Sequence, residues 1–187
     1  MRLRRTPFYF LRHGQTDWNL ENRAQGQTDV PLNAAGLQQA WSACTLIEPL
    51  NIQTICSSPL ARALTTAQII GDYTSKPVRI VEELAECSWG TKEGETKSTW
   101  FSDWKNEREI PSGAEHYSSF LIRALAGINK ALEYPGPVLV VAHGGVYWTI
   151  QKHTGLGEES DLPNAIPVFH EPIGRKSTLW SASPVSA

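Results

Sequence analysis

The sequence predicts an α/β fold: a single-domain, three-layer sandwich with a mostly parallel central sheet and helices on both faces. Short apolar runs bounded by breaking residues alternate with helix-periodic segments along most of the 187 residues. The run at 137–142 is apolar at every position, which is typical of a strand covered on both faces. No repeat, low-complexity tract or long linker divides the chain, so we expect one domain over residues 1–187.

The strands are expected at the apolar runs. Those with the strongest signal lie at residues 7–11, 53–56, 77–81 and 137–142. Two later segments are expected to form strands near an edge of the sheet, at 165–169 and 177–180.

Helical patterns lie between these runs. Asn33 is expected to cap a helix that ends near Ile47. Its apolar stripe is predicted to contain Leu37, Ala40, Trp41, Cys44 and Ile47. Ser58 as N-cap and Pro59 as first residue predict a second helix that ends near Gly71. Further helices are expected over residues 96–107 and 115–133, and from 144 onward.

Charge and hydropathy narrow the class of protein. A formal net charge of −2 and a pI near 6.2 argue against a nucleic-acid binder, which usually carries a basic face. The apolar stretch at 7–11 is too short to cross a membrane and lacks the cleavage pattern of a signal peptide. We therefore expect a cytoplasmic protein without nucleic-acid or membrane partners. Whether it is a monomer or a homodimer stays open.

The three cysteines carry no metal or redox signature. Cys44, Cys56 and Cys87 are odd in number and lack the close spacing of zinc sites and redox motifs. We expect reduced, buried thiols.

Charged and catalytic residue types follow three of the expected strands. Arg12 and His13 follow the first strand, Arg62 lies in the helix after the second, and His143 follows the last buried strand. In open α/β sheets the binding crevice lies beyond the carboxyl ends of the strands, beside helix N-termini that favour anions. Considered alone, His13 is interpreted as a solvated residue and Arg12 as a member of a surface ion pair. Together they predict an anion site.

The same residues carry a resemblance to a known family. The segment Phe10-Leu11-Arg12-His13-Gly14-Gln15-Thr16-Asp17-Trp18-Asn19 resembles the opening RHG motif of the histidine phosphatase superfamily, in its phosphoglycerate mutase-like branch. Further similar segments follow in the family order, at residues 22–26, 29–36, 57–63, 84–94 and 142–145.

The resemblance implies a metal-independent phosphatase that needs no cofactor and acts on a phosphate monoester of a small metabolite. His13 would be the nucleophile that forms a phosphohistidine, and Glu86 would be the proton donor. Catalysis would also use Arg12, Arg62 and His143, the last as an imidazolium. The residues implied to bind phosphate are Arg12, Gly14, Asn19, Gln25, Gly26, Arg62, His143 and Gly144.

Several alternatives stay open. Glu86 is either the proton donor or part of a solvated acidic turn at 82–86. Glu83 replaces it as the acid if the match to the family is displaced. A zinc or magnesium role for His13 and His143 is disfavoured because no carboxylate pattern accompanies them. The block 111–116 resembles a family block, but His116 stands where a small hydroxyl residue is common. His116 either begins a helix or faces the substrate.

The irregular segment at about 86–115 is expected to be a lid-like insertion. Its Trp89, Trp100, Phe101 and Trp104 either pack together or line an apolar wall. It is shorter than the corresponding part of the mutases in the family, which favours hydrolysis over phosphoryl transfer between substrates. A catalytically silent binding module on the same fold is the remaining alternative, and it would be expected to have lost His13, Arg62 or Glu86.

Overall fold

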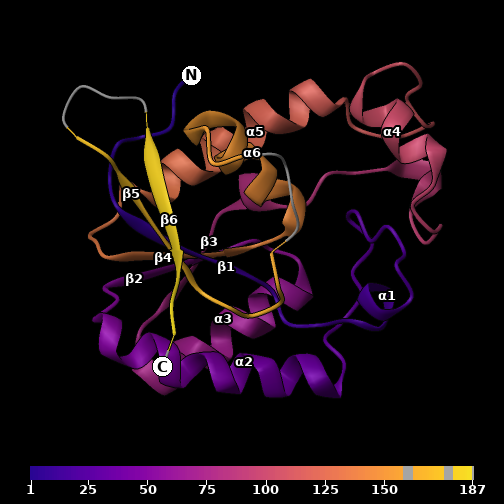
Figure 1. The fold of residues 1–187 in the computed structure, drawn as a ribbon. Coiled ribbons are helices and arrows are strands. Elements are labelled where there is room, and N and C mark those ends of the chain that lie inside the picture. The colour runs from indigo at the N-terminus through magenta and orange to yellow at the C-terminus, as the bar shows by residue number, and fades with distance from the viewer. Residues whose placement is uncertain (158–161, 175–178, 187) are drawn as a thin grey trace.

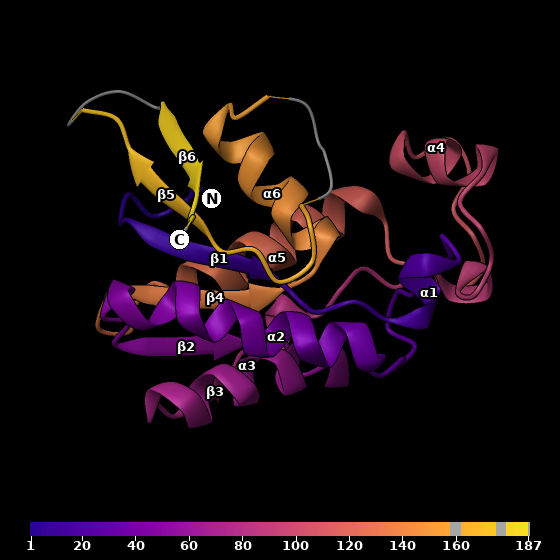
Figure 2. The same ribbon diagram turned by 60° about the horizontal axis from the view of Figure 1, so that its bottom comes forward.

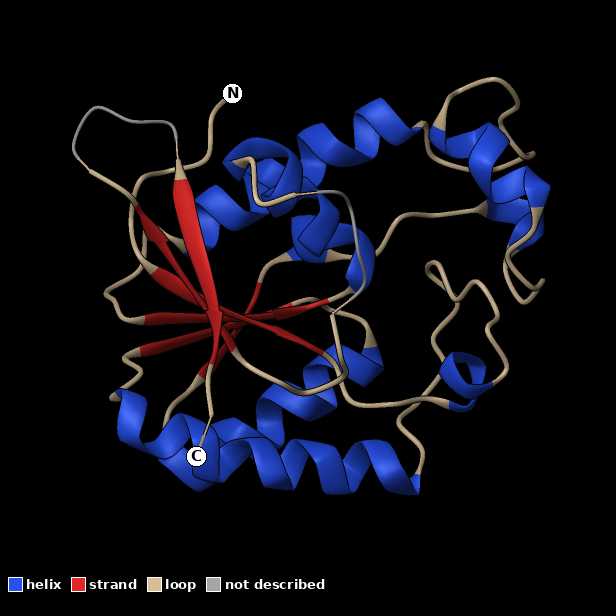
Figure 3. Cartoon of the chain, in the orientation of Figure 1, coloured by secondary structure: helices blue, strands red, loops and turns tan. Residues whose placement is uncertain are grey.

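The computed structural model describes residues 1–157, 162–174 and 179–186, and its centre is a six-stranded sheet (Figures 1 and 3). The strands are β1 (Phe8–Arg12), β2 (Thr54–Ser57), β3 (Val78–Ile80), β4 (Val138–Ala142), β5 (Val168–Pro172) and β6 (Trp180–Pro184), in the order β3-β2-β4-β1-β5-β6. Strands β3, β2, β4 and β1 are parallel, whereas β5 and β6 add two antiparallel neighbours at one edge. The predicted α/β class with a mostly parallel sheet is confirmed.

The strand register brings three chain segments to the same edge of the sheet. Arg12 at the end of β1 pairs with Ala142 at the end of β4, and Ser57 at the end of β2 pairs with Val141. The residues that follow these strands therefore meet at the carboxyl edge. His13 is one of them, and its backbone N–H continues the ladder by donating to the Ala142 carbonyl at 3.0 Å.

Helices cover both faces of the sheet (Figure 2). α2 (Ala34–Ile47) and α3 (Ala61–Thr74) lie on one face, and α5 (Tyr117–Ala131) and α6 (Gly144–Thr154) lie on the other. Alternate residues of β4 divide between the two cores. Leu139 and Val141 pack with α2 and α3, while Val138 and Val140 pack with α5 and α6. This is why the run at 137–142 is apolar throughout.

A smaller layer lies away from the sheet, beyond the carboxyl ends of its parallel strands (Figures 1 and 2). It contains α1 (Asp17–Leu20) and α4 (Thr99–Lys105), and an isolated bridge pairs Arg23, which follows α1, with Thr96, which precedes α4. The remaining short elements are the 3₁₀ turns η1 (Glu48–Leu50), η2 (Glu82–Leu84) and η3 (Gly90–Lys92). Within the described ranges, no helix has the length and apolar character to cross a membrane.

Three details of the sequence prediction were wrong. Leu37 and Trp41 of α2 are 41% and 54% exposed, and the buried stripe is instead Gly36, Ala40, Ala43, Cys44 and Ile47. Small residues on this stripe let α2 approach its neighbours closely, and large side chains turn to solvent. Ser58 does not cap α3, which begins at Ala61 without a side-chain cap.

The late strands also begin after their predicted starts. β5 begins at Val168, and β6 at Trp180. Ser177 and Thr178, at the predicted start of the last strand, lie outside the described residues. The three cysteines are free and buried, as predicted.

Candidate active site

A polar cavity opens at the carboxyl edge of the sheet. Its walls combine residues after β1 and β2, the turn after β3, and the start of α6. The residues that line it are Arg12, His13, Asn19, Arg23, Gln25, Arg62, Glu86, Trp89, Lys97, Gly144, Gly145 and Trp148. Most of the sequence-predicted site residues are therefore brought together here. The three exceptions are Gly14, Gly26 and His143, which are not among the lining residues.

His13 is held in one tautomer. It is 2% exposed, and its Nδ1 lies 2.6 Å from the Gly14 carbonyl oxygen, so Nδ1 carries the proton and Nε2 keeps its lone pair. Burial lowers the pKa of His13 well below its usual value, and the charges of Arg62 and Arg12 lower it further. The imidazole is therefore neutral at pH 7, as a nitrogen nucleophile must be.

Two of the three glycines predicted to bind phosphate, Gly14 and Gly26, do not line the cavity. The Gly14 N–H donates to Thr66 Oγ1 at 3.0 Å, and its carbonyl accepts from His13. A side chain at Gly14 would meet the Gly36 backbone of α2. The Gly26 carbonyl accepts from Arg62 Nη2 at 2.8 Å. Both glycines therefore orient the catalytic candidates, and neither faces the cavity.

Two arginines supply fixed positive charge. Arg62 is 1% exposed, and its Nη1 and Nη2 donate to the carbonyls of Thr28 and Gly26. Arg12 Nη1 donates to the Leu162 carbonyl at 2.7 Å. Burial lowers the pKa of Arg62 to about 10, which leaves it charged at neutral pH. The Nε atoms of both arginines are buried and have no hydrogen-bond partner among the described residues.

His143 lies between the nucleophile candidate and the end of β2. Its ring centroid is 5.3 Å from that of His13, and its Nε2 is 2.7 Å from Ser58 Oγ. Its Nδ1 is buried without a partner in the described part of the chain. Burial, followed by the charge of Arg62, lowers the pKa of His143 well below its usual value. Without a phosphate bound, His143 is therefore a neutral imidazole, because full burial beside two cations disfavours a third positive charge. The imidazolium expected with phosphate bound stays a prediction.

Glu86 is fixed by two backbone donors. Its Oε1 accepts from the Cys87 N–H at 2.9 Å and its Oε2 from the Gly145 N–H of α6 at 3.1 Å. A side chain at Gly145 would collide with Oε1, so glycine is required for this approach. Burial raises the pKa of Glu86, although the two N–H donors and Arg62 oppose the rise. Glu83 lies outside the cavity lining, and its carboxylate pairs with Lys130 at 3.0 Å.

The profile of the histidine phosphatase superfamily (branch 1) matches residues 8–168. This chain belongs to the histidine phosphatase superfamily. It is 37% identical over 143 residues to the "Uncharacterized phosphatase PhoE" of Bacillus subtilis (strain 168), which covers 74% of this chain and 72% of PhoE. It is 34% identical over 148 residues to the "Probable phosphoglycerate mutase GpmB" of Escherichia fergusonii, covering 73% and 68% of the two chains.

A solved structure agrees with this membership. The mycobacterial glucosyl-3-phosphoglycerate phosphatase in complex with VO3 superposes with a TM-score of 0.77 at 27% identity. The match covers 95% of this chain and 97% of that one. Family membership makes the chain a phosphatase.

Aromatic and basic residues also line the cavity of this histidine phosphatase. Trp89 lines it together with Trp148 of α6, whereas Trp100, Phe101 and Trp104 lie outside the lining and pack around Trp89. Lys97 Nζ lies 5.7 Å from the ring centroids of both Trp89 and Trp148. His116 is exposed, directly precedes α5 and does not line the cavity.

Asn19 and Gln25 complete the polar lining. Asn19 Oδ1 accepts from the Thr16 N–H in the capping box of α1, which leaves its amide N–H groups for other partners. Gln25 Oε1 is buried without a partner among the described residues. Both side chains therefore offer polar groups to a ligand.

Sequence reasoning missed several members of the site. Trp148 could have been found from helix periodicity, because it follows Gly144 by four residues in α6 and so lies on the same side of the helix. The bond of Ser58 to His143 and that of Thr66 to Gly14 join distant segments. Neither bond has a signal in a single sequence.

Proposed function

We propose that this histidine phosphatase hydrolyses phosphate monoesters of small metabolites through a phosphohistidine on Nε2 of His13, with Glu86 as proton donor and without a metal ion. The observation that carries the proposal is the set of buried, unpaired groups around a neutral histidine. Arg12 Nε, Arg62 Nε and His143 Nδ1 lack partners among the described residues, and all three lie close to His13 or border its cavity. Buried polar groups are normally satisfied, so such a group marks a place for a ligand.

The first step forms a covalent intermediate. Nε2 of His13 attacks phosphorus in line with the ester oxygen, a P–N bond forms, and the P–O bond to the leaving group breaks. The protonated carboxyl of Glu86 gives its proton to the departing oxygen, so that an alcohol leaves rather than an alkoxide. Glu86 is then a carboxylate.

The second step restores the enzyme. A water molecule attacks the phosphorus of the phosphohistidine while the Glu86 carboxylate takes its proton. The P–N bond breaks, inorganic phosphate leaves, and His13 and Glu86 return to their starting protonation states. Over the two steps Glu86 gives up and regains one proton, and His13 forms and breaks one P–N bond.

Arginine charge supplies the electrostatic stabilisation. Phosphoryl transfer is mainly a matter of positioning and of charge on the three equatorial oxygens. Arg12 and Arg62 are planar, charged at pH 7 and held by backbone carbonyls, so their geometry is set before substrate binds. When the Ser58 hydroxyl donates to His143 Nε2, the His143 Nδ1–H is left to donate to a phosphoryl oxygen. Asn19, Gln25 and the Gly144 N–H supply further contacts.

The lining of the cavity supports a small phosphorylated substrate. Arg12, Arg62 and Lys97 line it together with uncharged polar side chains, a combination that suits a phosphate group. We infer hydrolysis rather than mutase transfer from the short 86–115 segment. The likeness to GpmB makes transfer to a second substrate the alternative outcome of the test.

The test replaces the nucleophile. His13→Ala should lower turnover of 4-nitrophenyl phosphate by at least about 10³-fold while far-UV circular dichroism stays unchanged, and rapid acid-free quenching should trap a phosphoenzyme only in the wild type. The matched control is His116→Ala, an exposed histidine outside the cavity, which should keep full activity.

Three results would overturn parts of the proposal. Retained activity in His13→Ala removes the nucleophile assignment. Loss of activity in EDTA that a divalent cation restores removes metal independence, whereas vanadate should inhibit in either case. A phosphoenzyme that transfers to phosphoglycerate faster than to water makes the protein a mutase.

A further inference from the structure

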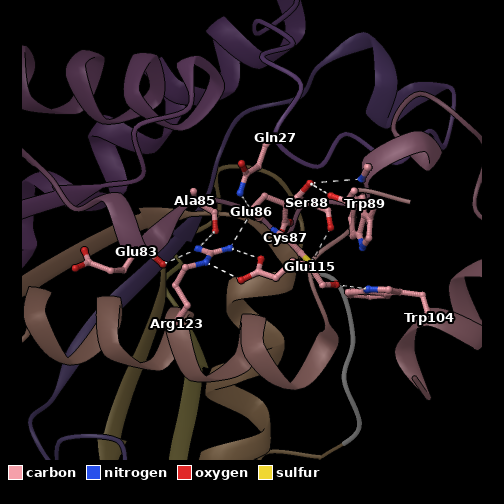
Figure 4. Close-up of polar contacts among 12 residues, drawn as sticks. Gln27, Glu83, Ala85, Glu86, Cys87, Ser88, Trp89, Trp104, Glu115 and Arg123 are labelled. Atoms are coloured by element: carbon pink, nitrogen blue, oxygen red, sulfur yellow. Dashed lines mark hydrogen bonds and ion pairs between the residues drawn. The ribbon is translucent and has the colours of Figure 1, made fainter. Parts of the chain in front are cut away.

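Arg123 of α5 binds the turn that carries Glu86 (Figure 4). Its Nη1 donates to the carbonyls of Glu83 and Ala85 at 3.0 and 2.9 Å, and its Nη2 donates to the Glu86 carbonyl at 3.2 Å. The Nε and Nη2 atoms also donate to the two carboxylate oxygens of Glu115, at 2.9 and 2.7 Å. Every one of the five guanidinium N–H bonds therefore has an acceptor.

This set of contacts needs arginine. A guanidinium carries five donors in a rigid plane, whereas a lysine ammonium carries three on a flexible stem. The plane also lies over the Phe120 ring, 5.3 Å from its centroid. The Arg123 and Glu115 side chains are only 25% and 20% exposed, so solvent screens their ion pair less than a surface pair.

The contacts fix Glu86 from a second side. Its carboxylate oxygens are already held by the N–H groups of Cys87 and of Gly145 in α6. Arg123 adds a bond from α5 to the backbone of the same residue. Glu86 is thus held both at its carboxylate and at its backbone carbonyl. Proton transfer depends steeply on such placement, because a displacement of about 1 Å can cost roughly 100-fold in rate.

Glu115 connects the Arg123 contacts to the far end of the 86–115 segment. Its N–H donates to the Ser88 carbonyl at 2.8 Å, and its carbonyl accepts from the Trp104 indole of α4 at 2.8 Å. One guanidinium therefore holds both ends of the segment. Glu115 also neutralises Arg123, so that the contact adds no net positive charge next to the proposed acid.

We propose that Arg123, paired with Glu115, is a positioning residue for the proton donor Glu86. The proposal rests on the proposed function, because it requires Glu86 to protonate the leaving group. It assigns to a salt bridge outside the cavity lining a role in leaving-group departure.

The experiment compares two substrates that differ in their need for a proton. 4-Nitrophenol leaves readily as an anion, whereas phenol from phenyl phosphate depends more on protonation. The quantity measured is kcat/KM, which covers the steps up to release of the alcohol and excludes hydrolysis of the phosphohistidine. Arg123→Gln should lose about 10-fold or more with phenyl phosphate and no more than about 3-fold with 4-nitrophenyl phosphate. Its inhibition by vanadate should stay within about 3-fold, since the phosphate-binding arginines are untouched.

Two variants serve as references. Glu86→Gln should show the same selective loss in larger measure, roughly 100-fold with phenyl phosphate. Lys130→Gln removes the other ion pair between α5 and this turn, that of Lys130 with the Glu83 carboxylate, and should leave the ratio of the two substrates unchanged. Glu115→Gln, which keeps the shape of the pair, covers the case in which Arg123→Gln does not fold, and should show the same selectivity.

The outcomes separate the two proposals. If Glu86→Gln is selective but the folded Arg123 and Glu115 variants slow both substrates equally, the positioning role is wrong and the proposed function stands. If Glu86→Gln itself shows no selectivity, the acid assignment fails and the positioning role fails with it.

Discussion

At the scale of single residues, burial shifts the pKa values of His13 and Glu86 in opposite directions, and each shift suits the role proposed for that residue. Desolvation disfavours the charged form of every group, so it lowers the pKa of His13 and raises the pKa of Glu86. At neutral pH the nucleophile candidate is therefore unprotonated, and a larger fraction of the carboxyl keeps its proton. A pair of titrating groups whose pKa values are pushed apart in one cavity is typical of an acid and base assignment.

This pairing predicts a pH dependence of the first step. Protonated Glu86 is the active form, so kcat/KM for phenyl phosphate should fall as pH rises through the raised pKa of Glu86. The well-lowered pKa of His13 predicts that its nucleophilicity is lost only at distinctly acidic pH. The measurement is the ratio of kcat/KM for 4-nitrophenyl phosphate to that for phenyl phosphate between pH 4.5 and 8, with each kcat/KM expressed per concentration of the substrate dianion. The ratio should rise with pH, and a flat ratio would contradict the acid role.

At the scale of elements, the start of α2 holds the loop that follows His13. Asn33 Oδ1 accepts from the Gly36 N–H at 2.9 Å and caps the helix. Its Nδ2 donates to Gln15 Oε1 at 3.2 Å and to Asp17 Oδ1 at 3.1 Å. The Asn33 side chain therefore caps the start of α2 and holds the segment between His13 and α1 in place.

This cap predicts a graded loss of stability. Asn33→Ala removes the cap and both loop contacts and should lower the free energy of unfolding by about 1–2 kcal/mol. Asn33→Ser keeps a cap oxygen but loses the amide donors, so its stability should fall between those of the wild type and the alanine variant. Urea unfolding at pH 7 measures both. Equal stability of Ser and Ala variants would show that the cap oxygen contributes nothing.

Elements were predictable wherever local signals agreed. The run at 137–142 and the cap at Asn33 each rest on neighbouring residues, and both were found within a residue. The buried stripe of α2 was wrong because periodicity alone does not say whether Trp41 or Ala40 faces the sheet. Ser58 was misassigned because a hydroxyl before a proline resembles a cap. Its Oγ accepts from the Leu60 N–H, one residue before α3 begins, and also bonds His143, 85 positions away.

At the scale of the whole molecule, the parallel sheet decides which distant residues meet. The register of β1, β2 and β4 brings His13, Arg62 and His143 together, and the rule that ligands bind at the carboxyl ends of strands was enough to predict this. The rule does not reach residues that do not follow a strand. Arg123 and Glu115 meet the turn of Glu86 through side-chain bonds between distant segments, and such bonds follow only from the folded chain.

Burial of neutral histidines predicts that the whole fold weakens in acid, and His170 isolates the effect away from the cavity. It is fully buried in β5, stacks on Phe8 with ring centroids 4.9 Å apart, and has Nε2 3.3 Å from the Tyr147 hydroxyl. Burial lowers the pKa of His170 to about 4, against about 6.5 in the unfolded chain. Between these values the unfolded chain binds more protons, so stability falls as pH drops from about 6.5 toward 4.

His170→Phe tests this at the scale of the whole molecule, because phenylalanine preserves the stack and cannot titrate. Urea unfolding at pH 7 and pH 4.5 should show that the variant loses about 2 kcal/mol less stability between the two values than the wild type does. His116→Ala, which removes an exposed histidine, should keep the wild-type difference. Because burial also lowers the pKa values of His13 and His143, the variant should retain part of the acid sensitivity. An unchanged difference in His170→Phe would show that His170 contributes nothing to the acid sensitivity.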